Sequence, residues 1–166
     1  MFGPITRKGP DRFRLRLSAD ERTTVAAFVE QLHGLLIAED PSSDPAVARL
    51  FPAAYPEDVL ANLEFERTHG DDLLKGKLAA LDTMQATLQR NELTEEETLA
   101  WLGSLNTLRL VIGTRLDIRE ESTAADFAGD EVAAGSFELY SYLTWLQGWV
   151  IDALAEGPNS SAAQPG

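Results

Sequence analysis

The chain has 166 residues, of which 44% are hydrophobic, and it carries a formal net charge of −13 and no cysteine. This length suits a single domain with a sizeable core, and the absence of cysteine excludes disulfide bonds and thiolate metal sites. The negative charge repels a phosphate backbone, which argues against general nucleic-acid binding. No run of residues resembles a membrane span or a signal peptide, so we expect a cytoplasmic protein without membrane contact.

The N-terminal region differs from the rest of the chain because it is basic. Residues 12–17 read RFRLRL, and this alternation of arginine with apolar residues predicts a half-buried strand. Residues 5–7 could pair with it as a hairpin through a turn at 8–11, or a second copy of the chain could supply the neighbouring strand. We therefore expect an N-terminal arm over residues 1–11. Its basic side chains are either a solvated face or a contact surface for an anion such as DNA.

The next part of the chain carries helical signals. Ser18–Glu21 matches a capping box, so a helix should begin there and end before the proline-rich loop at 40–45. A short helix is expected over 45–50. Leucines in near-heptad phase predict one long helix over 56–90, with a break at 68–70 as the alternative.

The stretch Trp101–Ile118 is apolar on nearly every face, which is typical of a central buried helix. A second capping box at Thr94–Glu97 opens this helix. Asn106 and Arg109 lie in its middle, and a buried polar group must find a partner or cost several kcal/mol.

The C-terminal third should hold a loop, a helix and a tail. Residues 119–135 are acidic and aperiodic, so they should be a mobile loop. Ser136 can cap a last helix over 137–156, which Gly157 and Pro158 end. Residues 157–166 should be a disordered tail. The sequence thus predicts one mainly α domain over residues 12–156, with four to five helices in an orthogonal or bundle-like arrangement and a small N-terminal β-hairpin or strand arm.

Three segments resemble, in order and spacing, an uncharacterised actinobacterial family catalogued as domain of unknown function twenty-seventeen. They are Arg49–Tyr55, Trp101–Asp117 and Leu143–Gln147. The resemblance extends over roughly residues 12–154 and implies a small cytosolic protein with no established activity. Genes of this family often lie near that of the ClpS protease adaptor, and some members have been labelled transcriptional regulators. An accessory role in regulated proteolysis is therefore open.

The two histidines raise the question of a metal site. Each stands in a Glu-x-x-His pair, Glu30–His33 and Glu66–His69, and such pairs on bundle helices are typical of di-iron carboxylate proteins. Ligands must point into the bundle, yet helical phase places both pairs away from the apolar stripes. We therefore expect surface pairs, no metal and no cofactor.

The motifs of common enzymes are missing from the sequence. It contains no Gly-x-Ser-x-Gly elbow, no P-loop and no dinucleotide-binding glycine motif. The acidic clusters are most simply solvated faces and helix N-terminal charges. We expect no catalytic residue, and an enzyme is not the favoured class.

Three inward polar residues are candidates for ligand binding: Arg67, Asn106 and Arg109. Asn106 and Arg109 share one line of the central helix with Gly113, and Arg67 replaces an apolar residue on the long helix. If the two helices pack, these groups form either a satisfied structural network or a pocket for an anion or a carboxylate. The carboxylates that could neutralise them in a structural network are Glu64, Glu66, Asp117 and Glu138.

The last helix carries two apolar stripes. One consists of Leu139, Leu143, Leu146, Val150 and Leu154. The other consists of the aromatic residues Tyr142, Trp145 and Trp149. A wide buried face explains both stripes, whereas an aromatic stripe beside a core face can also mark the interface with a protein partner or a second copy.

These observations favour a non-catalytic interaction or regulatory protein. The first alternative is a small-molecule binding protein or enzyme that uses Arg67, Asn106 and Arg109. The second alternative is a DNA-binding transcriptional regulator that uses the arginines of the N-terminal strand, against which the net charge weighs.

Overall fold

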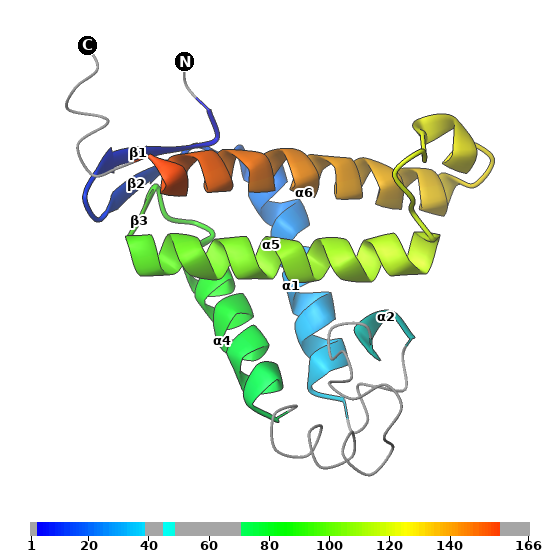
Figure 1. The fold of residues 1–166 in the computed structure, drawn as a ribbon, viewed down its shortest axis with the longest axis horizontal. Helices are drawn as coiled ribbons and strands as arrows, with labels where there is room; N and C mark the ends of the chain where they lie inside the picture. The colour runs from blue at the N-terminus through cyan, green and yellow to red at the C-terminus, as the bar shows by residue number, and fades with distance from the viewer. Residues whose placement is uncertain (1–2, 39–44, 49–70, 157–166) are drawn as a thin grey trace.

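A computed structural model of the protein describes residues 3–38, 45–48 and 71–156 (Figure 1). Within these residues, four long helices form the body of the fold, and a small sheet closes one end. The helices are α1 (Ala19–Leu36), α4 (Asp71–Thr87), α5 (Glu95–Leu116) and α6 (Glu131–Ala155). The predicted mainly α architecture with an N-terminal hairpin is confirmed.

Helices α5 and α6 lie side by side and antiparallel, and α1 and α4 run across them (Figure 1). The core lies where these helices meet, and its largest fully buried side chains include Trp101, Leu105, Leu143 and Leu146. No helix in the described ranges is long and apolar enough to cross a lipid bilayer.

The sheet contains three antiparallel strands in the order β1 (Ile5–Gly9), β2 (Arg12–Leu15) and β3 (Glu92–Leu93). Strand β2 thus pairs with β1 of the same chain, which is the hairpin alternative of the sequence analysis. Phe13 and Leu15 are buried and Arg14 is exposed, in agreement with the alternation. Strand β3 was not predicted, because two residues are too few to show a period of two.

Arg7 ties this sheet to the helices. Its side chain is buried, and its Nε donates a hydrogen bond to the carbonyl of Ala153 at 3.2 Å, near the C-terminal end of α6. Its Nη2 lies 3.4 Å from Oε1 of Glu95, in the first turn of α5, and its guanidinium stacks on Phe13 at 4.5 Å from the ring centroid. A cation near the carbonyl end of a helix is favoured by the helix dipole.

Helix α1 begins at the predicted residue. Ser18 caps it, and the Ser18 and Glu21 side chains form the two reciprocal bonds of a capping box. Its buried apolar residues form one stripe at spacings of three and four: Val25, Val29, Leu32 and Leu36.

A second buried arginine, Arg22, extends this stripe by one turn. Its Nη1 donates to the carbonyls of Leu88 and Arg90, both at 2.7 Å, and its Nε donates to the carbonyl of Leu17 at 3.0 Å. Arg22 thereby satisfies carbonyls that follow the end of α4, where no helical partner exists.

The predicted helices over 45–50 and 56–90 are only partly within the described residues. Helix α2 spans Pro45–Ala48, and α4 ends at Thr87, close to the predicted boundary. Within α4, Leu81 of the near-heptad leucine pattern is buried, and so is Met84. The prediction that one helix continues across residues 68–70, like the alternative of a break there, falls on residues outside the described ranges.

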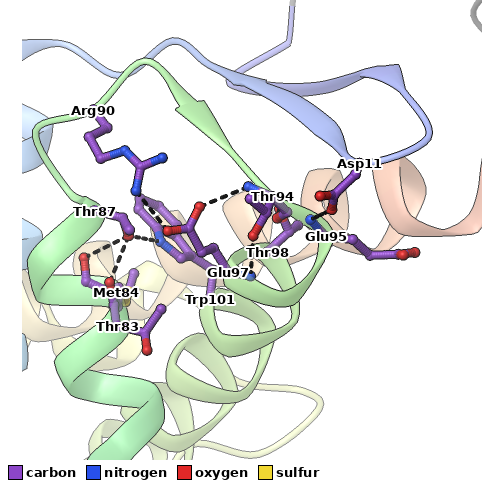
Figure 2. Close-up of polar contacts among 10 residues, drawn as sticks. All are labelled: Asp11, Thr83, Met84, Thr87, Arg90, Thr94, Glu95, Glu97, Thr98 and Trp101. Atoms are coloured by element: carbon purple, nitrogen blue, oxygen red, sulfur yellow. Dashed lines mark hydrogen bonds and ion pairs between the residues drawn. The ribbon is translucent and has the colours of Figure 1, made fainter.

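The corner between α4 and α5 is fixed by hydrogen bonds (Figure 2). The indole Nε1 of buried Trp101 donates to the hydroxyl of Thr87 at 2.7 Å, and that hydroxyl donates to the carbonyl of Thr83. The predicted capping box of Thr94 and Glu97 is present at the start of α5. Glu97 also accepts from Arg90 at 2.7 Å, so one carboxylate joins the loop to the helix.

Helix α5 is not buried on all sides, and that prediction is wrong. Leu99 and Leu110 are 54% and 43% exposed, and Gly103 and Asn106 are also exposed. These four residues recur at spacings of four, three and four, so they form one solvent-facing line. Its neighbours α4 and α6 cover only the other sides of α5.

The predicted loop over 119–135 is partly replaced by helix. Residues Ala124–Phe127 form the short helix η3, and α6 begins at Glu131 with Asp130, not Ser136, as its cap. Phe127 stacks on Phe137 at 4.9 Å between ring centroids. Two of the acidic residues, Asp126 and Asp130, accept hydrogen bonds at the starts of η3 and α6, where carboxylates are stabilised. The expected tail, 157–166, lies outside the described residues.

Candidate functional site

The predicted ligand-binding cluster does not come together as expected. Arg67 lies outside the described residues. Asn106 is exposed on the solvent-facing line of α5, so the prediction that it points inward is wrong. Arg109 is half-buried, and the structure places it beside a cavity.

Arg109 bridges α5 and α6 through uncharged groups. Its Nε donates to the hydroxyl of Thr144 at 2.9 Å, its Nη1 donates to Oε1 of Gln147, and its guanidinium lies 5.3 Å from the ring centroid of Tyr140. Spacings of four and three place these three partners on one side of α6. The guanidinium is thus held in place, and within residues 3–38, 45–48 and 71–156 no carboxylate pairs with it.

A cavity of about 180 Å³ lies beside Arg109, between α5 and α6. Its lining consists of Arg109, Leu110, Gly113, Thr114, Asp117, Ile118 and Tyr140. The Tyr140 ring packs directly on the backbone of Gly113, where a Cβ would lie 3.4 Å from it.

Of the four carboxylates that were expected to neutralise Arg109, the two within the described residues do not pair with it. Asp117 pairs with Arg119 at 3.2 Å, and Glu138 is exposed. Glu64 and Glu66 lie outside the described residues. A fixed cation with neutral partners next to a cavity could accept a carboxylate or a phosphate.

The three aromatic residues of α6 have different environments. Trp149 is half-buried, and a Cβ on Gly3 would overlap its ring, so the N-terminal segment covers it. The hydroxyl of Tyr142 donates to Oε2 of Glu21 at 2.7 Å. Trp145 packs its ring at 5.8 Å from that of Tyr142 and is 49% exposed. Trp145 is therefore the residue of this stripe that is open to a partner.

The contact between Glu21 and Tyr142 connects the start of α1 to α6. Burial raises the pKa of Glu21, but hydrogen bonds from the Ser18 backbone and from Tyr142 outweigh it, so the pKa is lowered overall. Burial, followed by the hydrogen bond and the charge of Glu21, raises the pKa of Tyr142 well above its usual range. The carboxylate therefore stays charged and the phenol stays protonated at neutral pH, which strengthens the bond.

The solvent-facing side of α6 around Trp145 carries exposed apolar residues with acidic residues beside them. Ile151 is 48% exposed, and Gly148, between it and Trp145, faces open space. We call these three residues the Trp145 face. Glu138 and Asp152 lie seven residues on either side of Trp145 and so on the same side of α6, and α6 contains no lysine or arginine.

The histidine pair of α1 is only partly as predicted. Glu30 is exposed, but His33 turns toward α4, where its Nε2 lies 3.1 Å from Oδ1 of Asp82. No group of three or more potential metal ligands occurs in the part of the chain that the structure describes. The pair Glu66–His69 lies outside that part.

Sequence reasoning missed the buried arginines, although a signal for both was present. Arg22 stands three residues before Val25 and thus on the buried stripe of α1. Arg7 stands two residues after Ile5, and both face the core side of β1. Both arginines bind main-chain carbonyls and serve the fold rather than a site.

Known proteins are similar to this chain over most of its length. Residues 3–154 match the family described as Domain of unknown function (DUF2017). The Oxidative stress regulator AosR of Mycobacterium bovis is 28% identical over 183 residues, which cover 88% of this chain and 83% of that protein. The protein of the same name from Mycobacterium tuberculosis has the same identity and coverage. No solved structure matches the chain.

Proposed function

Because the chain belongs to the DUF2017 family, and its curated relatives are called oxidative stress regulators, we propose that it is a non-catalytic regulatory protein. It acts by binding another protein through the Trp145 face. The observation that carries this proposal is the exposure of Trp145 and Ile151, 49% and 48%, on one helix.

An exposed tryptophan on an ordered helix supports a binding surface. Tryptophan is enriched at the centres of protein interfaces, where it contributes most when a partner removes it from water. Tyr142 packs against Trp145 with its ring tilted and is itself held by a hydrogen bond to Glu21, so the indole contacts an ordered side chain. Little side-chain freedom remains to be lost on binding.

The charge pattern favours a basic partner over DNA. Glu138 and Asp152 flank the Trp145 face, so an apolar surface with lysine or arginine at its rim complements it. On the hairpin, Arg12 already pairs with Glu92 at 3.0 Å. The chain as a whole is strongly negative, which weighs against the alternative of direct DNA binding.

A role in the response to oxidants would have to be indirect in this chain. It has no cysteine, the residue through which most proteins sense oxidants. Of its two methionines, Met84 is fully buried and Met1 lies outside the described residues. We therefore propose that the partner carries the reactive group and that this chain relays its state.

The test replaces Trp145 with glutamate and uses Val132→Glu as a matched control, since Val132 is 78% exposed near the other end of α6. Both variants add one negative charge to an exposed apolar position of the same helix. We expect Trp145→Glu to lose a protein that the parent and Val132→Glu both capture from native lysate. Light scattering shows whether that partner is a second copy of the chain.

Unchanged capture and unchanged mass in Trp145→Glu would contradict the proposal. Folding of both variants is checked by circular dichroism. If both variants lost the captured protein, the cause would be the added negative charge and not the Trp145 face.

A second candidate function is binding of a small anion at Arg109, favoured by its fixed guanidinium beside the 180 Å³ cavity. An anionic metabolite at 100 times its dissociation constant should stabilise the protein by about 2.7 kcal/mol. A thermal-shift screen measures this, and the shift should disappear in Arg109→Leu but persist in Arg14→Leu, a control at an exposed arginine of β2. A screen without hits, or a hit that Arg109→Leu retains, would remove this candidate.

The accessory role in regulated proteolysis rests only on the resemblance and finds no support in the contacts or the relatives. We do not extend the proposal to it. The proposed regulator is expected to act in the cytoplasm, and its binding function requires no cofactor.

A further inference from the structure

A cavity of about 240 Å³ opens between α4 and α5, away from the Trp145 face. Its lining consists of Asp72, Leu73, Gly76, Lys77, Ala80, Gly103 and Thr107. At Gly76 and Gly103, a Cβ would meet no atom of a neighbouring element within 4 Å. The two glycines therefore leave room in the cavity that any other residue would reduce.

Lys77 is the basic residue in this lining. It is half-buried, and burial lowers its pKa. No hydrogen bond or ion pair to Lys77 is found within residues 3–38, 45–48 and 71–156. An ammonium group that loses water without gaining a partner is destabilised, so a larger fraction of Lys77 is an uncharged, nucleophilic amine than of an exposed lysine.

The surroundings of Lys77 favour an uncharged reaction partner. Asp72 lines the same cavity, so its carboxylate repels an anion there. The remaining lining is small or apolar, apart from the hydroxyl of Thr107, which donates to the carbonyl of Gly103. Its oxygen can still accept a hydrogen bond. No thiolate in this chain competes for an electrophile.

We propose that Lys77 is a site of covalent modification by small uncharged aldehydes that enter the cavity between α4 and α5. The amine nitrogen attacks the carbonyl carbon, and a C–N bond forms while the carbonyl oxygen takes up the proton that nitrogen loses. Loss of one water molecule then leaves an imine. The step needs no oxidant or reductant, and water reverses it. This site is independent of the regulatory function proposed above.

The chain offers its own controls, because it contains three lysines, Lys8, Lys75 and Lys77, and the first two are exposed. The full chain is treated with acetaldehyde and cyanoborohydride, which traps each imine as an N-ethyl amine, and peptides are quantified by mass spectrometry. At neutral pH we expect Lys77 to react several-fold faster than Lys75. The α-amino group also reacts and is followed in its own peptide.

The pH dependence of the labelling rate distinguishes Lys77 from an ordinary exposed lysine. Because the pKa of Lys77 is lowered, its rate should level off at a lower pH than that of Lys75. The difference should shrink as the pH approaches the ordinary lysine pKa, where every amine is deprotonated. In concentrated urea all three lysines should react alike.

Filling the cavity tests its role. Gly103→Leu should slow labelling of Lys77 and leave Lys75 unchanged, and Gly103→Ala is the milder variant if the leucine impairs folding. Equal rates and equal pH profiles of Lys75 and Lys77 in the folded parent would overturn the proposal. Fast labelling of Lys77 that a folded Gly103→Leu or Gly103→Ala variant does not change would also overturn it.

Discussion

Replacing Trp101 with alanine should lower the free energy of unfolding by about 3–5 kcal/mol, the range for removing a large buried aromatic side chain. Trp101 is fully buried between α4 and α5, and its indole donates to Thr87. The substitution leaves a cavity and removes the donor from a buried hydroxyl. Urea denaturation followed by circular dichroism measures the loss.

Trp145→Ala is the matched control, because it deletes the same side chain at a half-exposed position. Its cost should be about 1 kcal/mol, mainly from the contact with Tyr142. Equal losses at the two positions would contradict the central place of Trp101 in the core.

A double-mutant cycle of Trp101→Phe and Thr87→Val should assign about 1 kcal/mol to their hydrogen bond.

The second large effect is expected at Arg22. Arg22→Met keeps most of the side-chain volume but removes the donors to the carbonyls of Leu17, Leu88 and Arg90. Main-chain carbonyls then stay in a buried region without a partner, at a cost of about 3 kcal/mol. The same urea denaturation experiment measures this change.

Arg14→Met serves as the control, because Arg14 is exposed on β2. Surface substitutions of this kind change stability by about 0.5 kcal/mol or less. Arg22→Lys should be intermediate, since an ammonium cannot match the planar fork that reaches several carbonyls at once. A stable Arg22→Met variant would show that water replaces the lost donors.

Local signals explain why the starts of α1 and α5 could be predicted. In each capping box both halves lie within four residues of each other, so the sequence contains the whole interaction. The alternation of residues 12–17 is local in the same way, and it placed Phe13 and Leu15 inside. The hairpin pairing followed from a nearby partner strand and turn.

The candidate sites depended on contacts between distant residues, and prediction was weaker there. Arg109 was singled out correctly as a polar residue that needs partners, but its partners lie 35 and 38 residues away on α6. No pattern within α5 identifies them. Lys77 was not singled out at all, because its place beside a cavity depends on how α4 diverges from α5.

Composition misled in two places for a common reason. Leucines at 99 and 110 suggested burial on every side of α5, yet a helix face is buried only if another element covers it. The small and acidic residues of 119–135 suggested disorder, yet Phe127 and Asp130 give that segment a stacking partner and a helix cap. The hydrophobicity of a residue indicates how much its burial would stabilise the fold. It does not indicate whether another element packs over that residue.

Neighbouring residues were enough to predict the starts of α1 and α5 and the alternation of strand β2, and composition alone excluded thiol chemistry. The exposure of Trp145, the covering of Trp149 and the uncharged partners of Arg109 became visible in the packed fold and not in the sequence. Helical periodicity assigns residues to faces of one helix, whereas exposure and partners follow from the packing of separate elements. The surfaces proposed for binding and modification therefore arise from that packing.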